Sequence, residues 1–220
     1  MNTIAIIPAR GGSETIVDKN VVSVAGKPLI EYTIDAVKGT KCILDDTLWF
    51  VYTDRYRQYH NLGIIRPAIV SKSDTPMGVT VSKAIETYEL CYGRVDNIIL
   101  LQPNCPLLSS KDIDDAYDLF LRSGNDCLVS VVKVYNEKKY YKDGYPLKQG
   151  VFHKQEDRPL CQRNSAIFIF RKNLLRSRGL IFDNNPVLYE MPCWKSVDID
   201  NEDDLFMAEC LIKGGALSGT

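Results

Sequence analysis

Short apolar runs alternate with segments of helical periodicity along almost the whole chain. The runs are continuous rather than alternating with polar residues, which is typical of strands buried on both faces of a parallel sheet. We expect strands at residues 3–8, 48–52, 97–102, 127–134, 166–170 and 187–191. Helices are expected at residues 27–38, 81–91, 110–120 and 202–212, with Pro28 in the first turn of the first helix. This order predicts an α/β fold with a doubly wound, mostly parallel sheet, whose ligands bind beyond the carboxyl ends of the strands.

The pattern changes at residues 135–163, where Lys, Tyr, Gly and Gln replace the aliphatic runs and Gly144-Tyr145-Pro146 supplies turn residues. We interpret this segment as a hairpin-like arm inserted into a single domain that spans residues 1–220. Its aromatic side chains are costly to expose, so packing on a second copy of the protein is expected. A solvated polar loop is the alternative. The aromatic residues are Tyr135, Tyr140, Tyr141, Tyr145 and Phe152.

Charge and cysteine content narrow the function classes. The 220 residues include 27 Lys and Arg against 28 Asp and Glu, a net charge of -1, which argues against a protein that coats nucleic acid or an anionic membrane. The seven cysteines form no C-x-x-C pair and only two histidines are present, so neither a disulfide framework nor a zinc site is expected. The first apolar run ends at Pro8 without a preceding charged region, so a cytoplasmic protein is expected.

A glycine-rich loop follows the first predicted strand, at residues 8–20. The adjacent Gly11 and Gly12 allow backbone N–H groups to approach an anion, and Arg10 and Lys19 add positive charge. We therefore predict a phosphate-bearing ligand. The spacing fits neither G-x-x-x-x-G-K-[ST] nor G-x-G-x-x-G, which disfavours a dinucleotide-dependent dehydrogenase.

A longer series of short strings extends this signal across the chain. The strings are IIPARGGS at 6–13, KN at 19–20, GKPLI at 26–30, TD at 53–54, RP at 66–67, SDT at 73–75, LQP at 101–103, PL at 106–107, NSAIF at 164–168 and DID at 198–200. In this order they resemble the N-acylneuraminate (sialic acid) cytidylyltransferases, or CMP-sialic acid synthetases, of nucleotide-diphospho-sugar transferase-like Rossmann-type fold. The resemblance implies Mg2+-dependent transfer of CMP from CTP to an acidic sugar, release of pyrophosphate, and a homodimer. The sugar oxygen attacks the α-phosphate directly, which requires positioning and charge neutralisation rather than a protein nucleophile.

The resemblance also implies roles for individual residues. The residues expected to bind the nucleotide are Ala9, Arg10, Gly11, Gly12, Ser13, Lys19, Arg66 and Asp74. Those expected to bind the sugar are Gln102, Asn104, Arg163 and Asn164. Of the whole set, Arg10, Lys19, Gln102 and Asp198 are expected to act in catalysis. Arg66 could instead brace a loop, and Asn164 could cap a turn.

Two carboxylates near the end of the chain are candidates for binding Mg2+. Asp198 and Asp200 are two residues apart, so in an extended segment both side chains point to the same side. Carboxylate oxygens suit Mg2+, and phosphate oxygens and water fill its other positions. Asp200 could alternatively belong to the cap of the last helix, because Asp200-Asn201-Glu202 is typical of a helix start.

Several positions depart from the family pattern. Glu14 stands where the family usually has a phosphate-binding lysine, Asn104-Cys105 replaces Thr-Ser, and Leu108 replaces a frequent arginine. A carboxylate roughly 4 Å from a phosphate costs about 1 kcal/mol in water and about 4 kcal/mol at an effective dielectric constant near 20. The acceptor is expected to be a sialic acid or a related nine-carbon keto acid, such as pseudaminic or legionaminic acid. A sugar 1-phosphate or phosphonate acceptor, and a nucleotide-binding relative without turnover, are the alternatives.

Overall fold

The computed structural model describes residues 2–13, 15–134, 141–142, 145–146, 160–178, 181 and 185–217. The strands of its central sheet are β1 (Thr3–Pro8), β4 (Trp49–Tyr52), β5 (Asn97–Leu101), β6 (Cys127–Val134), β9 (Leu160–Arg171) and β10 (Val187–Glu190). They are hydrogen-bonded in the order β10-β6-β9-β5-β1-β4. Strand β9 runs antiparallel to both of its neighbours, and every other pairing in this sheet is parallel. The predicted mostly parallel sheet is thus confirmed.

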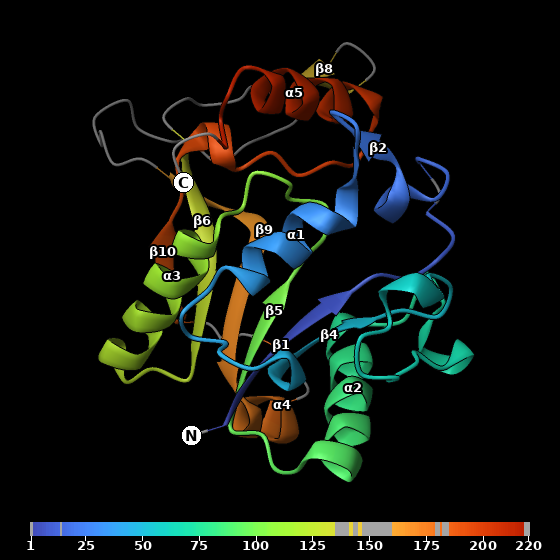
Figure 1. The fold of residues 1–220 in the computed structure, drawn as a ribbon. Coiled ribbons are helices and arrows are strands. Elements are labelled where there is room, and N and C mark those ends of the chain that lie inside the picture. Colours follow the sequence, from blue (N-terminus) through green and yellow to red (C-terminus); the bar gives the residue numbers. More distant parts are fainter. Residues whose placement is uncertain are drawn as a thin grey trace.

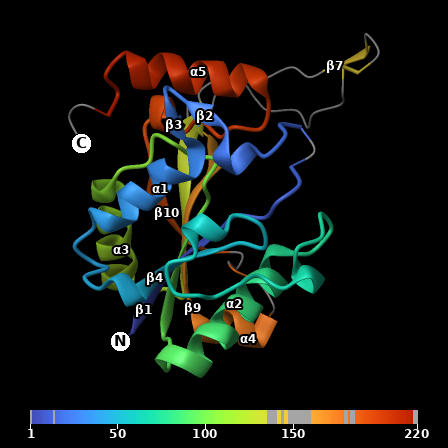
Figure 2. The same ribbon diagram turned by 45° about the vertical axis from the view of Figure 1, so that its right-hand side comes forward.

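Helices cover both faces of the sheet. They are α1 (Leu29–Lys38), α2 (Met77–Tyr92), α3 (Ser110–Ser123), α4 (Lys172–Arg178) and α5 (Glu202–Lys213). Figure 2 shows α1 and α3 on one face and α2 and α4 on the other, so that the sheet is the middle of three layers. Helix α5 crosses above the edge of the sheet at which the parallel strands end, next to β2 (Ser23–Val24) (Figure 1). This arrangement is the predicted doubly wound architecture.

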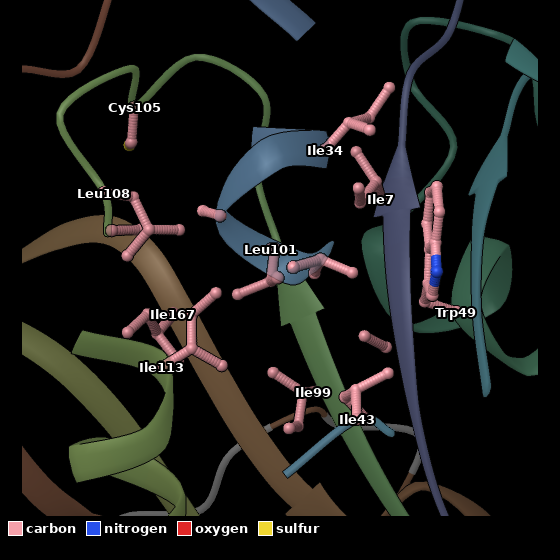
Figure 3. Packing of buried hydrophobic residues seen from close by; sticks show 14 of the residues in the cluster. Ile7, Ile34, Ile43, Trp49, Ile99, Leu101, Cys105, Leu108, Ile113 and Ile167 are labelled. Atoms are coloured by element: carbon pink, nitrogen blue, oxygen red, sulfur yellow. The ribbon is translucent and has the colours of Figure 1, made fainter. Parts of the chain in front are cut away.

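Two apolar clusters fill the space between the layers. One lies between the sheet and helices α1 and α3, where the strand residues Ile7, Ile99 and Ile167 pack with Ile34 and Ile113 (Figure 3). The other lies under α2 and α4, and the face of α2 that carries Val81, Ala84, Ile85 and Tyr88 is buried in it. Strands β1, β4 and β5 are buried along their whole length on both sides, which accounts for their continuous rather than alternating apolar character.

The helix ends follow from local sequence. Ser109 is the N-cap of α3 and forms a capping box with Asp112, while Gly124 in the left-handed conformation ends the helix. Asn201, rather than Asp200, is the N-cap of α5. The expected first helix begins later than predicted: Lys27–Pro28 form β3, which pairs with β2, and α1 starts at Leu29. Five short 3-10 turns complete the described chain: η1 (Lys19–Val21), η2 (Asp46–Leu48), η3 (Arg57–Tyr59), η4 (Ala68–Val70) and η5 (Cys193–Lys195).

The predicted arm is described only in part. Strands β7 (Tyr141–Lys142) and β8 (Tyr145–Pro146) pair antiparallel, whereas residues 135–140, 143–144 and 147–159 lie outside the described residues. At the carboxyl-terminal end of the expected arm, residues 160–163 belong to β9 and pair with β6. The cysteines, all within the described ranges, form no disulfide bond. Among the described helices none is both long enough and apolar enough to cross a membrane.

Candidate active site

The glycine-rich loop leaves the carboxyl end of β1 and is anchored at both of its ends. The Ala9 amide donates to the Tyr52 carbonyl at 3.0 Å, which ties the loop to the end of the neighbouring strand β4. The side-chain amide of Asn20, which is buried, donates to the Arg10 carbonyl at 2.8 Å and closes the loop. The predicted nucleotide-binding residues 9–13 and Lys19 therefore lie on one loop beyond the ends of β1 and β4, where ligands of such sheets bind.

The two adjacent glycines are required for different reasons. A Cβ on Gly11 would lie 2.8 Å from Cδ and 3.1 Å from Cβ of Arg55, so the Arg55 side chain occupies the space that any larger residue would need. Gly12 has φ +73°, a backbone conformation that favours glycine, and its Cβ position is open. The Gly11 amide donates to Oδ1 of Asp54 at 2.9 Å. An amide that binds a carboxylate in this way can also bind a phosphate oxygen.

Arg55 is a residue of this loop region that the sequence analysis missed. Its guanidinium forms an ion pair with Asp18 at 2.9 Å, and its side chain is largely exposed. The neighbouring Thr53-Asp54 string was recognised, but no local pattern indicates that the following side chain packs on Gly11. Glu14, the departure from the family pattern on this loop, lies outside the described residues.

Lys19 connects the glycine-rich loop to the candidate metal segment. Its Nζ donates to the Ile199 carbonyl at 2.7 Å and forms an ion pair with Oδ1 of Asp200 at 3.0 Å. Ile199 and Asp200 follow Lys19 by 180 and 181 positions in the sequence. The fold therefore brings a cation of the predicted phosphate loop into contact with a carboxylate of the predicted metal pair.

Asp198 lies in a partly buried, negatively charged environment. Burial, together with the charge of Asp200, raises the pKa of Asp198 from 3.8 to about 6, although a hydrogen bond with Ser165 and the charge of Lys19 act in the opposite direction. The Asn104 side-chain amide donates to Oδ1 of Asp198. The structure thus joins Asn104, a predicted sugar-binding residue, to a predicted metal ligand.

The carboxylates of Asp198 and Asp200 offer oxygen ligands of the kind that a hard divalent cation binds. A partly buried carboxylate that is repelled by a second carboxylate is stabilised by a cation, and Mg2+ prefers oxygen ligands. Within the described ranges no cluster of three or more His, Cys, Asp or Glu side chains is suited to a metal ion. Asp198 and Asp200 could therefore supply two ligands, and phosphate oxygens and water the others.

The neighbouring Cys105 is inert at this position. Its thiol is fully buried, and its Sγ lies 3.5 Å from the Asn164 carbonyl. Burial raises its pKa well above the usual value, and the charges of Asp198 and Asp200 raise it further. The thiol therefore stays protonated, and a nucleophilic role for it is disfavoured.

Asn164 lies at a bulge in strand β9. Pairing with β6 changes from Val129 opposite Phe168 to Val131 opposite Arg163, so extra residues of β9 bulge outward at this point. The Asn164 side chain is 4% exposed. It accepts from Ser130 Oγ at 2.6 Å and donates to Ser196 Oγ at 2.9 Å. These contacts favour a bracing role inside the fold, rather than the cap of a turn before the strand.

The bulge also explains a second residue that the sequence analysis missed. Ser165 follows Asn164 with φ +61°, which is uncommon for a residue other than glycine. From this position the Ser165 side chain lowers the pKa of Asp198, against the effect of burial. Nothing in the local sequence distinguishes Ser165 from an ordinary strand residue.

The remaining predicted site residues differ in position. Arg66 is 5% exposed, and its Nε donates to the Val70 carbonyl at 2.9 Å, which favours the loop-bracing alternative. Gln102 is half-buried directly after β5, at the same edge of the sheet as the glycine-rich loop. Arg163 is exposed on β9, and Asp74 on a turn before α2. No hydrogen bond or ion pair between described residues joins Asp74 to the rest of the predicted site.

Comparison with known proteins identifies the family. The cytidylyltransferase family profile matches residues 4–205. The chain belongs to the cytidylyltransferase family. A relative of this cytidylyltransferase, the N-acylneuraminate cytidylyltransferase of Streptococcus agalactiae serotype III (strain NEM316), is 30% identical over 216 residues, covering 93% of this chain and 52% of that protein. The chain thus spans about half the length of that relative.

In two further comparisons the similarity extends over almost the whole length of both proteins. The CMP-N,N'-diacetyllegionaminic acid synthase of Legionella pneumophila is 25% identical to this cytidylyltransferase, over 97% of each chain. A CMP:2-keto-3-deoxy-manno-octonic acid synthetase solved with CTP superposes with a TM-score of 0.69 at 15% identity, over 97% of this chain and 99% of that one. The second similarity shows the fold alone. Together with the family match, these comparisons confirm the resemblance and the fold class predicted from the sequence.

Proposed function

We propose that this cytidylyltransferase transfers CMP from CTP to an acidic nine-carbon keto sugar, N-acylneuraminate or a related nonulosonate. The names of its relatives support the nucleotide and the class of acceptor. The observation that carries the proposal is the contact of Lys19 with Ile199 and Asp200, which unites a loop suited to phosphate with a pair of carboxylates suited to Mg2+.

The proposed reaction is a direct displacement at the α-phosphorus of CTP. The anomeric hydroxyl oxygen of the sugar forms a bond to the α-phosphorus and gives up its proton to water, while the bond between the α-phosphorus and the oxygen that bridges the α- and β-phosphates breaks. Pyrophosphate leaves with the electron pair of that bond. Such a reaction depends on alignment of the two substrates and on neutralisation of charge.

The chain supplies groups for both requirements. The amides of residues 11–13 and the side chains of Arg10 and Lys19 would hold the triphosphate, and Gln102 and Asn104 would orient the sugar. Arg163 would pair with the sugar carboxylate. Asp198 and Asp200 would hold Mg2+, which, when bound, neutralises charge on phosphate oxygens as pyrophosphate leaves.

The proposal includes a homodimer in the cytoplasm. The aromatic residues of segment 135–159 support the dimer, because they are costly to expose to water. Light scattering on the purified protein tests the oligomeric state, and cell fractionation tests the compartment. A monomer at micromolar concentration would contradict the proposed dimer. Recovery of the protein with the membrane fraction would contradict the proposed location.

A substrate screen tests the proposed activity. Purified protein is incubated with Mg2+, one nucleoside triphosphate and one acid from a panel of N-acylneuraminate, legionaminic acid and pseudaminic acid, and the nucleotide sugar is detected by mass spectrometry. We expect a CMP-sugar with CTP and at least one of the acids. A preference for UTP or GTP would instead support a sugar 1-phosphate acceptor. No product under conditions in which an established synthetase is active would support a nucleotide-binding relative without turnover.

A further inference from the structure

The segment between β10 and α5 carries both candidate metal ligands, yet it contains little regular structure. Only the short turn η5 interrupts it, and residues 196–200 form neither helix nor strand. Backbone hydrogen bonds of a helix or sheet therefore do not fix the position of Asp198. Contacts to neighbouring elements must do so.

Lys195, the last residue of η5, forms a buried ion pair with helix α3. Its Nζ lies 2.7 Å from Oδ2 of Asp112 and 3.1 Å from Oγ of Ser109. The Lys195 and Asp112 side chains are each 9% exposed. The proposed mechanism uses neither of them.

The acceptor of this ion pair is itself held in place. Asp112 accepts from the Ser109 amide at 3.0 Å as part of the capping box that begins α3. The Lys195 ammonium is therefore directed at a carboxylate whose position is set by the helix. A buried ion pair stabilises a fold little more than well-packed apolar side chains would, but its directional hydrogen bonds can select one arrangement of the chain.

The same side of the segment is held at two further points. The Ile199 amide donates to the Asn104 carbonyl at 2.9 Å, and Asn104 lies on the loop that connects β5 to α3. Ser196 accepts from the buried Asn164 amide of β9 at 2.9 Å. Lys19 holds the segment from the other side, through Ile199 and Asp200. Lys195 is the charged anchor on the amino-terminal side of Asp198, three residues before it.

We propose that Lys195 is a positioning residue that, through its ion pair with Asp112, places Asp198 for binding Mg2+. This inference rests on the proposed function of the Asp198 and Asp200 pair. Without the ion pair, the segment would sample other positions before Mg2+ binds. Formation of the metal site would then require ordering of the chain at the moment of binding, which weakens affinity.

The test compares Lys195→Met with a matched control, Lys172→Met. Lys172 forms an ion pair with Glu89 at the other end of the sheet, and these side chains are 13% and 21% exposed. Both substitutions remove the cation of a largely buried ion pair and should lower the melting temperature. Two readouts separate them: thermal stabilisation by Mg2+ with CTP in the absence of sugar, and hydrogen exchange of the amides of residues 196–200 in the metal-free protein.

For Lys195→Met we expect the Mg2+ concentration that gives half-maximal stabilisation to rise about tenfold to hundredfold, as for other residues that orient metal ligands. Exchange at residues 196–200 should be faster, and Lys195→Arg should restore both values towards those of the wild type. Lys172→Met should leave the Mg2+ concentration for half-maximal stabilisation and the exchange rate at residues 196–200 within twofold of the wild type. Unchanged Mg2+ dependence and unchanged exchange in Lys195→Met would overturn the proposal.

A second variant keeps the test decisive if Lys195→Met does not fold. Lys195→Met with Asp112→Asn removes both charges, so that no unpaired charge remains buried, and keeps a side-chain oxygen that can accept from the Ser109 amide of the capping box. We expect this variant to regain stability but to keep the weakened Mg2+ dependence and the faster exchange. Wild-type values of the melting temperature, the Mg2+ dependence and the exchange rate in this variant would contradict a positioning role. Absence of any Mg2+ effect in the wild type would instead refute the proposed function, on which the inference rests.

Discussion

Replacement of Gly11 by alanine is expected to lower the free energy of unfolding by about 1–3 kcal/mol, the usual cost of overpacking a close contact. The new Cβ would lie 2.8 Å from Cδ and 3.1 Å from Cβ of Arg55. Arg55→Ala removes the first of these contacts and keeps the second. Its own cost should be only about 0.2–1 kcal/mol, because its ion pair with Asp18 is largely exposed.

A double-mutant cycle measures the coupling between these two residues. The wild type, both single variants and the double variant are unfolded in urea, and we expect Gly11→Ala to cost at least about 0.5 kcal/mol less when Arg55 is alanine. Gly12→Ala is the control: its φ of +73° should cost about 1–2 kcal/mol in either background, since no described atom beyond its two chain neighbours lies within 4 Å of its Cβ position. An equal cost of Gly11→Ala in both backgrounds would refute the view that Arg55 is the reason for glycine at this position.

Three further substitutions test other parts of the account. Asp198→Asn should reduce pyrophosphate release by more than about 100-fold, since it removes a metal ligand rather than a residue that orients one. The raised pKa of Asp198 means that the folded protein loses stability as the pH rises from about 4 to 6. The neutral variant should therefore melt no lower than the wild type at pH 7.5. Asn164→Ala should lower stability by about 1–3 kcal/mol in urea denaturation, because two serine hydroxyls lose their buried partner. Arg66→Met should cost about 1–3 kcal/mol in the same assay, because the buried Val70 carbonyl loses both guanidinium donors and, of its described donors, keeps only the longer hydrogen bond from Thr80 Oγ1 at 3.4 Å. A wild-type stability in either of the last two variants, or wild-type activity in the first, would contradict the assigned roles.

The fold was predictable wherever burial imposes a period on the sequence. The face of α2 with Val81, Ala84, Ile85 and Tyr88 packs as its spacing predicts, although Cys91, the last residue of the same predicted stripe, is exposed. The strands buried on both sides appear as continuous apolar runs. The first part of β9 was missed because residues 160–163 are exposed and only two of them, Leu160 and Cys161, are apolar, although all four pair with β6. An apolar run identifies a strand only where the sheet is covered by helices.

The site was predictable as a set of motifs but not as a set of contacts. The resemblance indicated both Lys19 and Asp200, yet their ion pair depends on the packing of residues 181 positions apart. Arg55, Ser165 and Lys195 were missed for the same reason. Their roles arise from a packing contact on a glycine, a bulge in β9 and a buried ion pair with α3, none of which leaves a local pattern in the sequence.

In the proposed active site, the glycine-rich loop and residues 198–200 together bind CTP and Mg2+. The most direct test is pyrophosphate release by the wild type and by Asp198→Asn, each with CTP and N-acylneuraminate, legionaminic acid or pseudaminic acid, with and without Mg2+. We predict release by the wild type that requires CTP, one of the acids and Mg2+ together, and its near-complete loss in Asp198→Asn. Release that continues without Mg2+, or that is equal in the two proteins, would contradict the account.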